Sequence, residues 1–472
     1  MRSRRDQVQA YRFQTRRIGS ALLAGEPETN ELPMRRYGIA VLGSILIGAV
    51  VFAGFGVWGL VSPGGKRPPR DTIILERETG AKYVYLAGLL HPVLNWTSAR
   101  LILGQEKPAT RTMAQASLRD VPRGRPVGIP GVPDALPVAS ALLGPPWSVC
   151  SAPRSAASVV PAAHVLAGSV PAGGTPLGAE GLLVSVDERR YLLWEDRRLR
   201  VRDNAVLAAL GWTAIRPVPV GEAFVNAVPA GPDLTGLAVP DAGSPARVQI
   251  AGRAALVGQF FRAAGQHYVL LSDGLAPVGA VSAALAAAEG RSVVELPAQE
   301  VGRVLLSTTV EPPGFPDRVP SARGADGRAA MVCAAYPGTS PVERPVRIQT
   351  FGTATLDAGD APPPGVGADG VRSADRVTLP GGRAALVVAQ AAPGATAPST
   401  VFLVTDQGIK YPLPQDKADQ VRGALGYKGS RPVPVPAAIL ALVPTGAALD
   451  PEAAVLLQNP PAVNPSASRG VN

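Results

Sequence analysis

The sequence is poor in the side chains on which most enzymes rely. Its 472 residues include only two cysteines and three histidines, and aromatic residues account for 5%. A zinc site needs several Cys or His ligands at close spacing, and a thiol nucleophile needs a partnered base. Walker A loops, G-x-S-x-G elbows and H-E-x-x-H motifs are also missing from the sequence. We therefore expect no metal, no cofactor and no catalytic residue, and enzymatic activity is poorly supported.

The two cysteines, Cys150 and Cys333, lie far apart in the chain, in the segments PWSVC and AAMVC. Each follows an apolar run, so two free, buried thiols are one reading. The other is a disulfide, for which only one pairing within the chain exists. Closing so long a loop stabilises a fold by roughly 5 kcal/mol in the chain-entropy model. We predict the disulfide, because the region around it should lie in an oxidising compartment.

Acidic side chains are outnumbered, since 36 Asp and Glu stand against 46 Lys and Arg and the net charge is +10. The excess is strong in residues 1–36, which hold eight arginines and only four acidic residues. A basic tail just before a membrane segment is typical of contact with an anionic inner leaflet. We expect anionic inner-membrane lipid as a partner, and no nucleic acid.

An amphipathic helix is predicted in this tail, from about Asp6 to Leu23. Its apolar stripe has a 3-4-3-4 spacing, and its other faces are rich in arginine. The stripe consists of Val8, Tyr11, Thr15, Ile18 and Leu22, and the arginines assigned to the contact surface are Arg12, Arg16 and Arg17. Such a helix could lie on lipid or dock on a cytoplasmic partner domain, and the sequence does not separate these alternatives.

A single transmembrane helix is predicted over residues 37–61, which carry no charge and are long enough to cross the hydrocarbon core. Tyr37 and Trp58 lie near its two ends, where amphipathic rings favour the interface. The arginines before the span place the N-terminus in the cytoplasm and the large C-terminal part on the far side of the membrane. A cleaved signal peptide is the competing reading, but the apolar run is too long for one and no A-x-A site follows.

Small residues recur every four positions along this span, at Ala40, Ser44 and Gly48. They would share one helix face and let another transmembrane helix approach closely. Ordinary glycine enrichment in membrane helices is the alternative explanation.

A motif recurs in the part of the chain beyond the membrane segment. GWTAIRPVPV at 211–220 matches GYKGSRPVPV at 426–435, and Val228-Pro229 with Gly231 matches Val443-Pro444 with Gly446 at the same offset. Upstream of each match the pattern predicts a strand, a tight polar turn, a second strand and a short helix. Weaker copies are YVLLSDGLAPV at 268–278 and VYLAGLLHPVL at 84–94, so we count four units of one kind.

These observations predict an α+β protein with an elongated domain on the far side of the membrane, in which four strand/helix repeats surround a central β-rich domain. The central domain combines two segments without the motif, each holding one cysteine. The predicted divisions are a cytoplasmic tail 1–36, the span 37–61, repeat 1 at 71–127, central segments 128–177 and 315–377, repeat 2 at 178–249, repeat 3 at 250–314, repeat 4 at 378–457, and a polar, flexible tail 458–472.

Arginines alternate with apolar residues at 197–202, in the predicted third element of repeat 2. Arg197, Arg198, Arg200 and Arg202 flank Leu199 and Val201, which predicts a basic strand face. Such faces are usually plain exposed surface, and a binding surface for an acidic partner or a wall polymer is the alternative. Glu195 and Asp196 fall in the preceding turn, where carboxylates are usually only solvated.

The N-terminal segment RSRRDQVQAYRFQTRRIGSALL, followed by the span, resembles the EccB family of type VII (ESX) secretion systems. The likeness continues through ETGAKYVYLAGLLHPVLNWTSARLILG at 78–104 and RGRPVGIPGVPDALP at 123–137, and reaches both cysteine segments. The resemblance implies a structural subunit of the inner-membrane secretion core whose periplasmic domain has four repeats around a disulfide-bonded centre. It also implies partners: other EccB copies, the FtsK/SpoIIIE-type ATPase EccC, EccD, EccE and the mycosin protease.

A scaffold is the function that the sequence favours, since one helix alone cannot enclose a channel. A weak ATPase activity attributed to some family members is not carried over, because nothing here resembles a phosphate-binding loop. The alternatives are a membrane-anchored hydrolase of nucleotides or wall polymers, and a protein whose repeats bind the wall.

Overall fold

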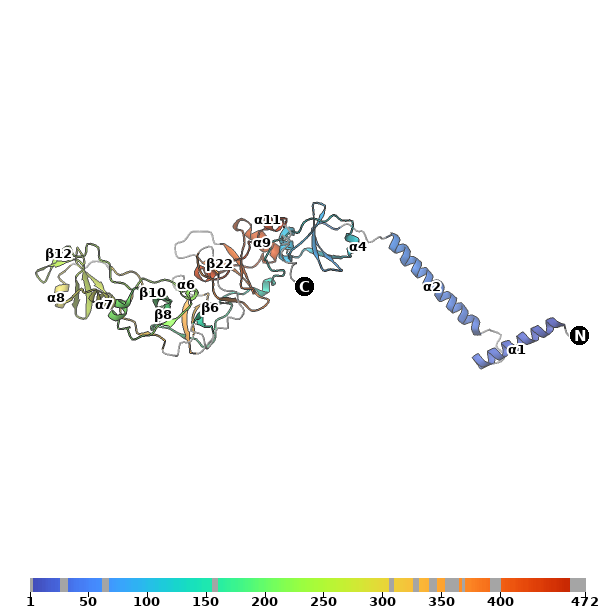
Figure 1. The fold of residues 1–472 in the computed structure, drawn as a ribbon, viewed down its shortest axis with the longest axis horizontal. Coiled ribbons are helices and arrows are strands. Elements are labelled where there is room, and N and C mark those ends of the chain that lie inside the picture. The colour runs from blue at the N-terminus through green and yellow to red at the C-terminus, as the bar shows by residue number, and fades with distance from the viewer. Residues whose placement is uncertain are drawn as a thin grey trace, which may run out of the picture.

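The computed structural model is an elongated α+β molecule, with two N-terminal helices that lead into a long β-rich body (Figure 1). It describes residues 3–25, 33–61, 68–154, 160–304, 310–325, 331–338, 346–352, 365–366, 370–390 and 400–458. The prediction of a mixed fold with one apolar helix and a large β-rich part is confirmed.

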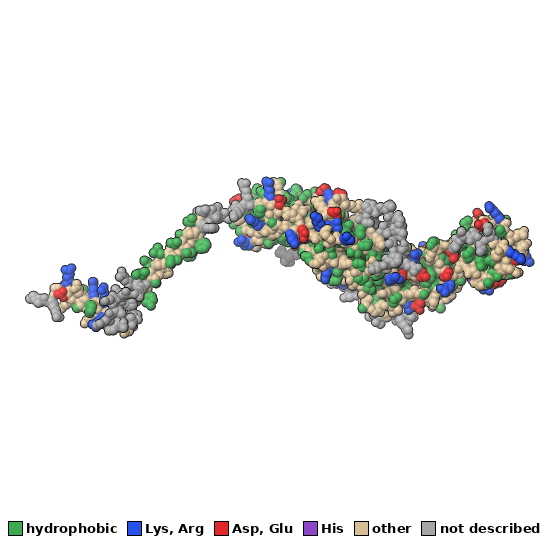
Figure 2. Space-filling model, turned by 180° about the vertical axis from the view of Figure 1, so that it is seen from behind, with side chains coloured by type: hydrophobic (Ala, Val, Ile, Leu, Met, Phe, Trp, Pro, Cys, Tyr) green, Lys and Arg blue, Asp and Glu red, His purple; other side chains and the backbone are tan. Residues whose placement is uncertain are grey.

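The first helix, α1, runs from Arg4 to Ala24, one or two residues beyond each end of the predicted helix. A capping box between Ser3 and Asp6 begins it, and Gly25 in the left-handed conformation ends it. The second helix, α2, spans Pro33–Val61 and contains the segment Tyr37–Val57, which is apolar and long enough to cross a membrane. None of that segment is buried against the rest of the chain, so lipid can surround it (Figure 2).

Four sheets of the body share one strand order, third-second-first-fourth, with the fourth strand parallel to the first. In each, a helix links the third strand to the fourth, as a parallel connection requires, and a short helix follows. We call the sheets with their helices units 1 to 4. Unit 1 comprises β1 Thr72–Glu76, β2 Lys82–Leu86, β3 Leu89–Pro92, α3 Trp96–Leu103, β4 Ala109–Met113 and α4 Gln115–Leu118. Unit 2 comprises β8 Gly181–Val186, β9 Arg189–Trp194, β10 Arg197–Val201, α5 Asn204–Ala209, β11 Val218–Pro219 and α6 Glu222–Ala227.

Units 3 and 4 repeat this plan. Unit 3 comprises β14 Phe260–Ala263, β15 Gln266–Leu270, β16 Leu275–Val278, α7 Ala280–Ala288, β17 Val293–Glu295 and α8 Ala298–Val301, preceded by a hairpin of β12 Pro245–Ile250 and β13 Arg253–Leu256. Unit 4 comprises β22 Ala384–Gln390, β23 Val401–Thr405, β24 Lys410–Pro412, a 3-10 turn η2 Gln415–Lys417, α9 Ala418–Leu425, β25 Val433–Pro436 and α10 Ala437–Ala441, followed by α11 Pro451–Ala454.

The motif shared by 211–220 and 426–435 is the link from helix to fourth strand. Gly211 and Gly426 have positive φ and end α5 and α9. The aromatic residue that follows, Trp212 or Tyr427, turns back and is almost fully buried. The sequence match therefore reflects one helix-ending turn used twice.

The Val-Pro-x-Gly motif is a return segment that pairs with the outer edge of the third strand. Gly231 donates to the carbonyl of Arg198 at 2.8 Å, and Gly446 donates to that of Lys410 at 2.8 Å. Unit 1 has the same arrangement at Gly124, which donates to Leu90 at 3.1 Å. This third copy, Val121-Pro122-Arg123-Gly124, has the full Val-Pro-x-Gly motif and was overlooked in the sequence.

The central sheet joins two distant segments in the order β21-β6-β5-β19-β20-β7. Its strands are β5 Trp147–Pro153, β6 Pro161–Ala167, β7 Thr175–Pro176, β19 Met331–Tyr336, β20 Arg347–Phe351 and β21 Arg376–Thr378; a 3-10 turn η1, Ala139–Ala141, precedes them. One short strand, β18 Ala322–Arg323, falls in the segment predicted to be central but pairs with β8 of unit 2 instead.

Shared cores join the units in an order that differs from the chain order. Leu101 and Val132 pack with Tyr411 and Val421, so units 1 and 4 are neighbours. Trp147 of the central sheet packs with side chains of units 2 and 4, and α7 of unit 3 packs on unit 2. From the membrane helix outward, the order is unit 1, unit 4, central sheet, unit 2 and unit 3 (Figure 1).

Candidate functional site: the joint between units 1 and 4

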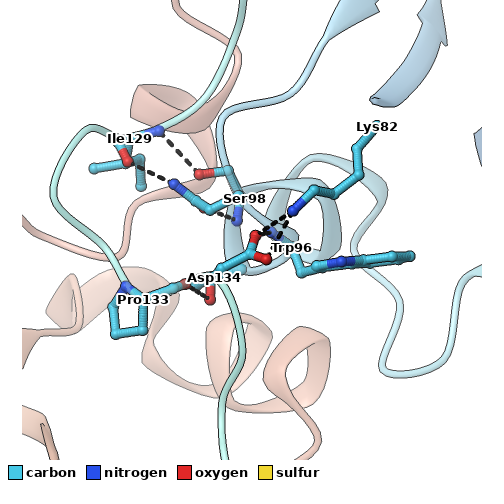
Figure 3. Close-up of polar contacts among 8 residues, drawn as sticks. Lys82, Trp96, Ser98, Ile129, Pro133 and Asp134 are labelled. Atoms are coloured by element: carbon cyan, nitrogen blue, oxygen red, sulfur yellow. Dashed lines mark hydrogen bonds and ion pairs between the residues drawn. The ribbon is translucent and has the colours of Figure 1, made fainter. Parts of the chain in front are cut away.

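Two of the segments that carry the resemblance, 78–104 and 123–137, meet at the start of α3 (Figure 3). Asn95 caps this helix, because its Oδ1 accepts a hydrogen bond from the Ser98 amide at 2.8 Å. The Asn95 Nδ2 donates to the Ile129 carbonyl at 2.9 Å, and the Ser98 Oγ accepts from the Ile129 amide at 2.9 Å. The helix cap is therefore also the attachment point for the strap, by which we mean residues 125–137.

Asp134 holds the next part of the strap. Its carboxylate accepts from the Trp96 amide at 2.9 Å and from Lys82 Nζ at 2.7 Å, while Lys82 lies 5.8 Å from the centre of the Trp96 ring (Figure 3). A carboxylate at the N-terminus of a helix is also favoured by the helix dipole. The Asp134 side chain is 54% exposed, so the ion pair itself contributes only about 0–1 kcal/mol.

Two buried tyrosines of unit 4 hold the far end of the strap. Tyr411 donates its hydroxyl to the Gly131 carbonyl at 3.1 Å, and Tyr427 donates to the Pro137 carbonyl at 2.7 Å. Burial raises the pKa of Tyr427 to about 12, against a smaller lowering by the Arg100 charge. Burial also raises the pKa of Tyr411. Both phenols therefore remain protonated hydrogen-bond donors at neutral pH.

A pocket of about 470 Å³ opens beside this joint, between the start of α3 and the loop before β4. It is lined by Trp96, Thr97, Arg100, Glu106, Lys107, Pro108, Thr110, Asp134, Ala135 and Leu136. No group of three His, Cys, Asp or Glu residues that could hold a metal occurs within the described part of the chain. The joint has the chemistry of a structural clamp.

The central disulfide is a second feature that ties distant segments together, and here the link is covalent. Cys150 and Cys333 are bonded, with an S–S distance of 2.05 Å, and face each other across β5 and β19. Both are fully buried, together with Met331 and Phe351. The bond therefore joins the two halves of the central sheet where solvent does not reach.

The predicted contact residues of the N-terminal helix lie on α1 without packing against the body. Val8, Tyr11, Ile18 and Leu22 are between 51% and 80% exposed, although apolar side chains of this size are normally covered. Arg12, Arg16 and Arg17 are exposed as well. The structure places these side chains on one helix but supplies no partner for the apolar stripe among the residues it describes.

The predicted packing face of the span is available on α2. Ala40 and Ser44 are exposed and Gly48 is half-exposed, and the Ser44 hydroxyl donates to the Val41 carbonyl of its own helix. Tyr37 is 72% exposed near the start of the apolar segment. The side chains of Trp58 and of the arginines before Tyr37 fall outside the described residues.

Two expectations about single residues need correction. Asp196 is not simply solvated, because it accepts a hydrogen bond from the Ile348 amide at 2.8 Å and so pins the β9–β10 turn to the central sheet. Gln458, the first residue of the predicted flexible tail, is held in place: its backbone amide donates to the Pro126 carbonyl at 2.8 Å, and its side-chain Nε2 donates to the Gly128 carbonyl at 3.0 Å. The remainder of the predicted tail lies outside the described residues.

The joint residues Asn95, Asp134, Tyr411 and Tyr427 were not singled out from the sequence. Asn95 and Asp134 fall in the segments 78–104 and 123–137 quoted for the resemblance, and Tyr427 falls in the repeated motif at 426–435, but these patterns assign none of the residues to a joint. Their pairing depends on contacts between residues up to about three hundred positions apart, which spacing along the chain does not reveal.

The fold defines a class: an elongated α+β protein with one helix apolar and long enough to cross a membrane, and a β-rich body in which four sheets share one strand order. The sequence family described as "Type VII secretion system ESX-1, transport TM domain B" matches residues 2–460. The chain belongs to this family, the EccB family, and is a component of the type VII secretion machinery.

Relatives and solved structures agree with this assignment. The chain is 33% identical to the ESX-3 secretion system ATPase EccB3 of Mycolicibacterium smegmatis, over 98% of this chain and 92% of that protein. It is 27% identical to the ESX-1 secretion system ATPase EccB1 of the same species, over 95% and 94%. A structure of an EccB3 dimer from the ESX-3 core complex has a TM-score of 0.61 at 30% identity, covering 81% of this chain and 99% of that one. An intact ESX-5 inner membrane complex contains a chain with a TM-score of 0.61 at 23% identity, which shows the fold alone.

Proposed function

We propose that the chain is a structural subunit of the inner-membrane core of a type VII (ESX) secretion system, anchored by α2, with α1 in the cytoplasm and units 1 to 4 in the periplasm. The observation that carries this proposal is the joint. By the clamp we mean the capped helix α3, the strap and the two buried tyrosines of unit 4. It fixes unit 1, the unit next to the membrane helix, to unit 4 and hence to the rest of the elongated body, which we call the rod.

The rod acts as a spacer and an assembly surface in this proposal. Shared cores run from unit 1 to unit 3, so a displacement at one end is transmitted along packed side chains rather than lost in linkers. We assign the four units to the four predicted periplasmic repeats, and the disulfide-bonded sheet to the central domain between them. Other EccB copies and the mycosin protease would contact this part from the periplasmic side.

The membrane part supplies the other contacts. The exposed stripe of α1 would dock on EccC, EccD or EccE or on anionic lipid, and the small-residue face of α2 would pack against another span. The relatives' names contain the word ATPase, but the proposed role of this chain requires no nucleotide chemistry.

The first experiment is to tag the C-terminus, extract native membranes in mild detergent, and measure the mass and protein content of what co-purifies. We expect an assembly much larger than a monomer that contains an FtsK-like ATPase and polytopic membrane proteins. A lone monomer under these conditions would contradict the proposal and favour a stand-alone enzyme or wall-binding protein.

A pair of matched variants separates lipid contact from protein contact at α1. Val8→Asp with Ile18→Asp introduces two charges into the stripe, whereas Phe13→Asp introduces one on the far side of the same helix, where Phe13 is 67% exposed. If a protein docks on the stripe, the double variant loses co-purifying subunits and Phe13→Asp retains them. If lipid covers the stripe, both variants retain the subunits and the double variant alone makes α1 more accessible to protease.

A further inference from the structure

A row of arginines on β10 has no role in the clamp or the membrane anchor. Arg198, Arg200 and Arg202 occupy alternate positions, so their side chains share one face of the unit 2 sheet. Arg200 pairs across the sheet with Tyr191, and Arg189 stands two residues before that tyrosine on the same face. We call Arg189, Arg198, Arg200 and Arg202 the arginine face.

Little negative charge balances this face. Arg189 forms an ion pair with Glu222 at 3.0 Å, and Arg202 donates to the Thr235 hydroxyl at 3.3 Å. For Arg198 and Arg200, no ion pair with a carboxylate occurs among the residues that the structure describes. Arg200 and Arg202 are exposed to solvent. The face thus presents more positive charge than its own surroundings neutralise.

Arg198 is the least well satisfied of the four. Its guanidinium lies 5.9 Å from the centre of the Tyr191 ring, and its Nε is buried without a hydrogen-bond acceptor. Burial lowers the pKa of Arg198 and the Arg189 charge adds to that effect, while Tyr191 and Asp233 act in the opposite direction. A half-buried cation without a full counter-charge is a costly arrangement, which an incoming anion would relieve.

The edge of β10 is already occupied, which limits how a partner can approach. The Arg198 amide donates to Pro229 at 2.9 Å, Gly231 donates to the Arg198 carbonyl, and Leu234 donates to the Arg200 carbonyl at 2.8 Å. A partner therefore cannot add as a further strand and must lie across the side chains. Figure 1 also shows β10 far along the rod from α2, which excludes the headgroups of the anchoring membrane as the source of the anion.

Spacing favours a peptide as the occupant. Residues two apart on a strand are separated by about 6.6–6.8 Å, and alternate side chains of an extended peptide have that same repeat. The planar guanidinium fork matches carboxylates with two parallel hydrogen bonds.

We propose that the arginine face binds an acidic segment of a partner protein in extended conformation, with carboxylates at alternate positions opposite Arg198, Arg200 and Arg202. This inference concerns an interaction surface on unit 2 and holds whether or not the clamp is the basis of assembly. The attraction between exposed charges is screened by salt, so binding weakens as ionic strength rises.

The test uses the full-length protein in neutral detergent and a fluorescent probe peptide, acetyl-(Glu-Thr)6-amide, followed by fluorescence anisotropy. The matched peptide (Gln-Thr)6 lacks the charges. We expect the triple variant Arg198→Gln, Arg200→Gln, Arg202→Gln to weaken binding of the Glu-Thr peptide at least tenfold. The control removes the same charge from exposed arginines elsewhere, as Arg253→Gln, Arg303→Gln, Arg318→Gln, and should change the affinity less than twofold.

Three outcomes would overturn the proposal. Equal binding of both peptides by the wild-type protein is the first, and an equal loss of affinity in the two triple variants is the second; either would mark the attraction as unspecific. Tighter binding of purified wall polysaccharide, with the same dependence on the three arginines, would assign the face to a wall polymer instead. Because Arg198 is half-buried, the triple variant could also affect folding, so the single variant Arg200→Gln serves as a second test. Arg200 is exposed, so this variant should leave the thermal unfolding midpoint unchanged and should still weaken peptide binding several-fold.

Discussion

The side-chain amide of Asn95 makes two structural contacts: its oxygen caps α3, and its nitrogen donates to the strap. Asp203 caps α5 in the same way, because its Oδ1 accepts a hydrogen bond from the Val206 amide at 3.0 Å, but within the described part of the chain its carboxylate bonds to nothing beyond that helix. The two residues therefore separate the energetic contribution of a cap from that of a cap combined with a tertiary contact.

We predict that Asn95→Ala lowers the free energy of unfolding by about 2–4 kcal/mol, since it removes a cap and leaves the buried Ile129 carbonyl without its donor. Asp203→Ala should cost only about 1 kcal/mol, as expected for a cap alone. Urea unfolding followed by tryptophan fluorescence measures both. Equal losses for the two variants would show that the strap contact contributes nothing.

The central disulfide permits a prediction about redox state. Reduction, or the double variant Cys150→Ala with Cys333→Ala, should lower the free energy of unfolding by about 2–5 kcal/mol, because the unfolded chain is no longer constrained. Both sulfurs are buried, so reduction should require prior denaturation. The measurement is the urea midpoint of the oxidised and reduced protein. A double variant that unfolds at the oxidised wild-type midpoint would contradict it.

Tyr427 gives the joint a dependence on alkaline pH. Its pKa is raised by burial to about 12 in the folded state, above an ordinary value of about 10. The protonated form is thus favoured by folding, so the stabilisation is complete below pH 10 and is lost as the pH rises from about 10 to 12. The urea midpoint should fall over this range, and should fall less steeply for Tyr427→Phe. Identical slopes would mean that the phenol titrates equally in both states.

At the scale of elements, the predictions made from sequence were a hairpin and one helix for each repeat, because the signals for these elements are local. Polar turns, apolar runs and a glycine after each helix lie within about a dozen residues of one another. The first strand of each unit and the parallel fourth strand were not predicted. Their pairing with each other spans 33 to 46 positions, and β11 is only two residues long, too short for any period-2 pattern.

The glycines of the return segments, Gly231 and Gly446, lie close to side chains of the third strand, which leaves little room for a Cβ atom. A Cβ on Gly446 would lie 2.5 Å from the buried ring of Tyr411, whereas a Cβ on Gly231 would lie 3.3 Å from the nearest Leu199 atom. We predict that Gly446→Ala costs about 1–3 kcal/mol through forced displacement of the ring, and that Gly231→Ala costs less. Gly429→Ala, where a Cβ meets nothing within 4 Å, is the control. Thermal unfolding ranks the three, and a Gly446→Ala midpoint at or above that of the control would refute the packing argument.

At the scale of the whole molecule, orientation across the membrane is the assumption on which the function depends. We predict that a membrane-impermeant maleimide labels Arg253→Cys, at the distal hairpin, in intact spheroplasts, and labels Gln9→Cys on α1 only after the membrane is opened. Both sites are exposed, and the native cysteines are bonded and buried. The reversed labelling pattern would place α1 outside the cytoplasm.

The arrangement of the units was the part least accessible to sequence reasoning. Composition and charge identify the anchor, and the repeats identify the units, but neither says that unit 4 rather than unit 2 lies beside unit 1. That order is decided by complementary apolar surfaces, such as Leu101 and Val132 against Tyr411 and Val421, whose contact is independent of distance along the chain.

This order has a consequence for how the protein is made. The outer part leaves the membrane through unit 1, extends to unit 3, and comes back so that unit 4 and Gln458 close upon unit 1. In the orientation proposed above, unit 1 would emerge from the translocation channel first, and the apolar surface around Leu101 would stay uncovered until unit 4 has been exported. A chain that stops early would leave this surface bare beside the membrane, open to chaperones and proteases, so that only completely exported copies would contain the finished joint between units 1 and 4.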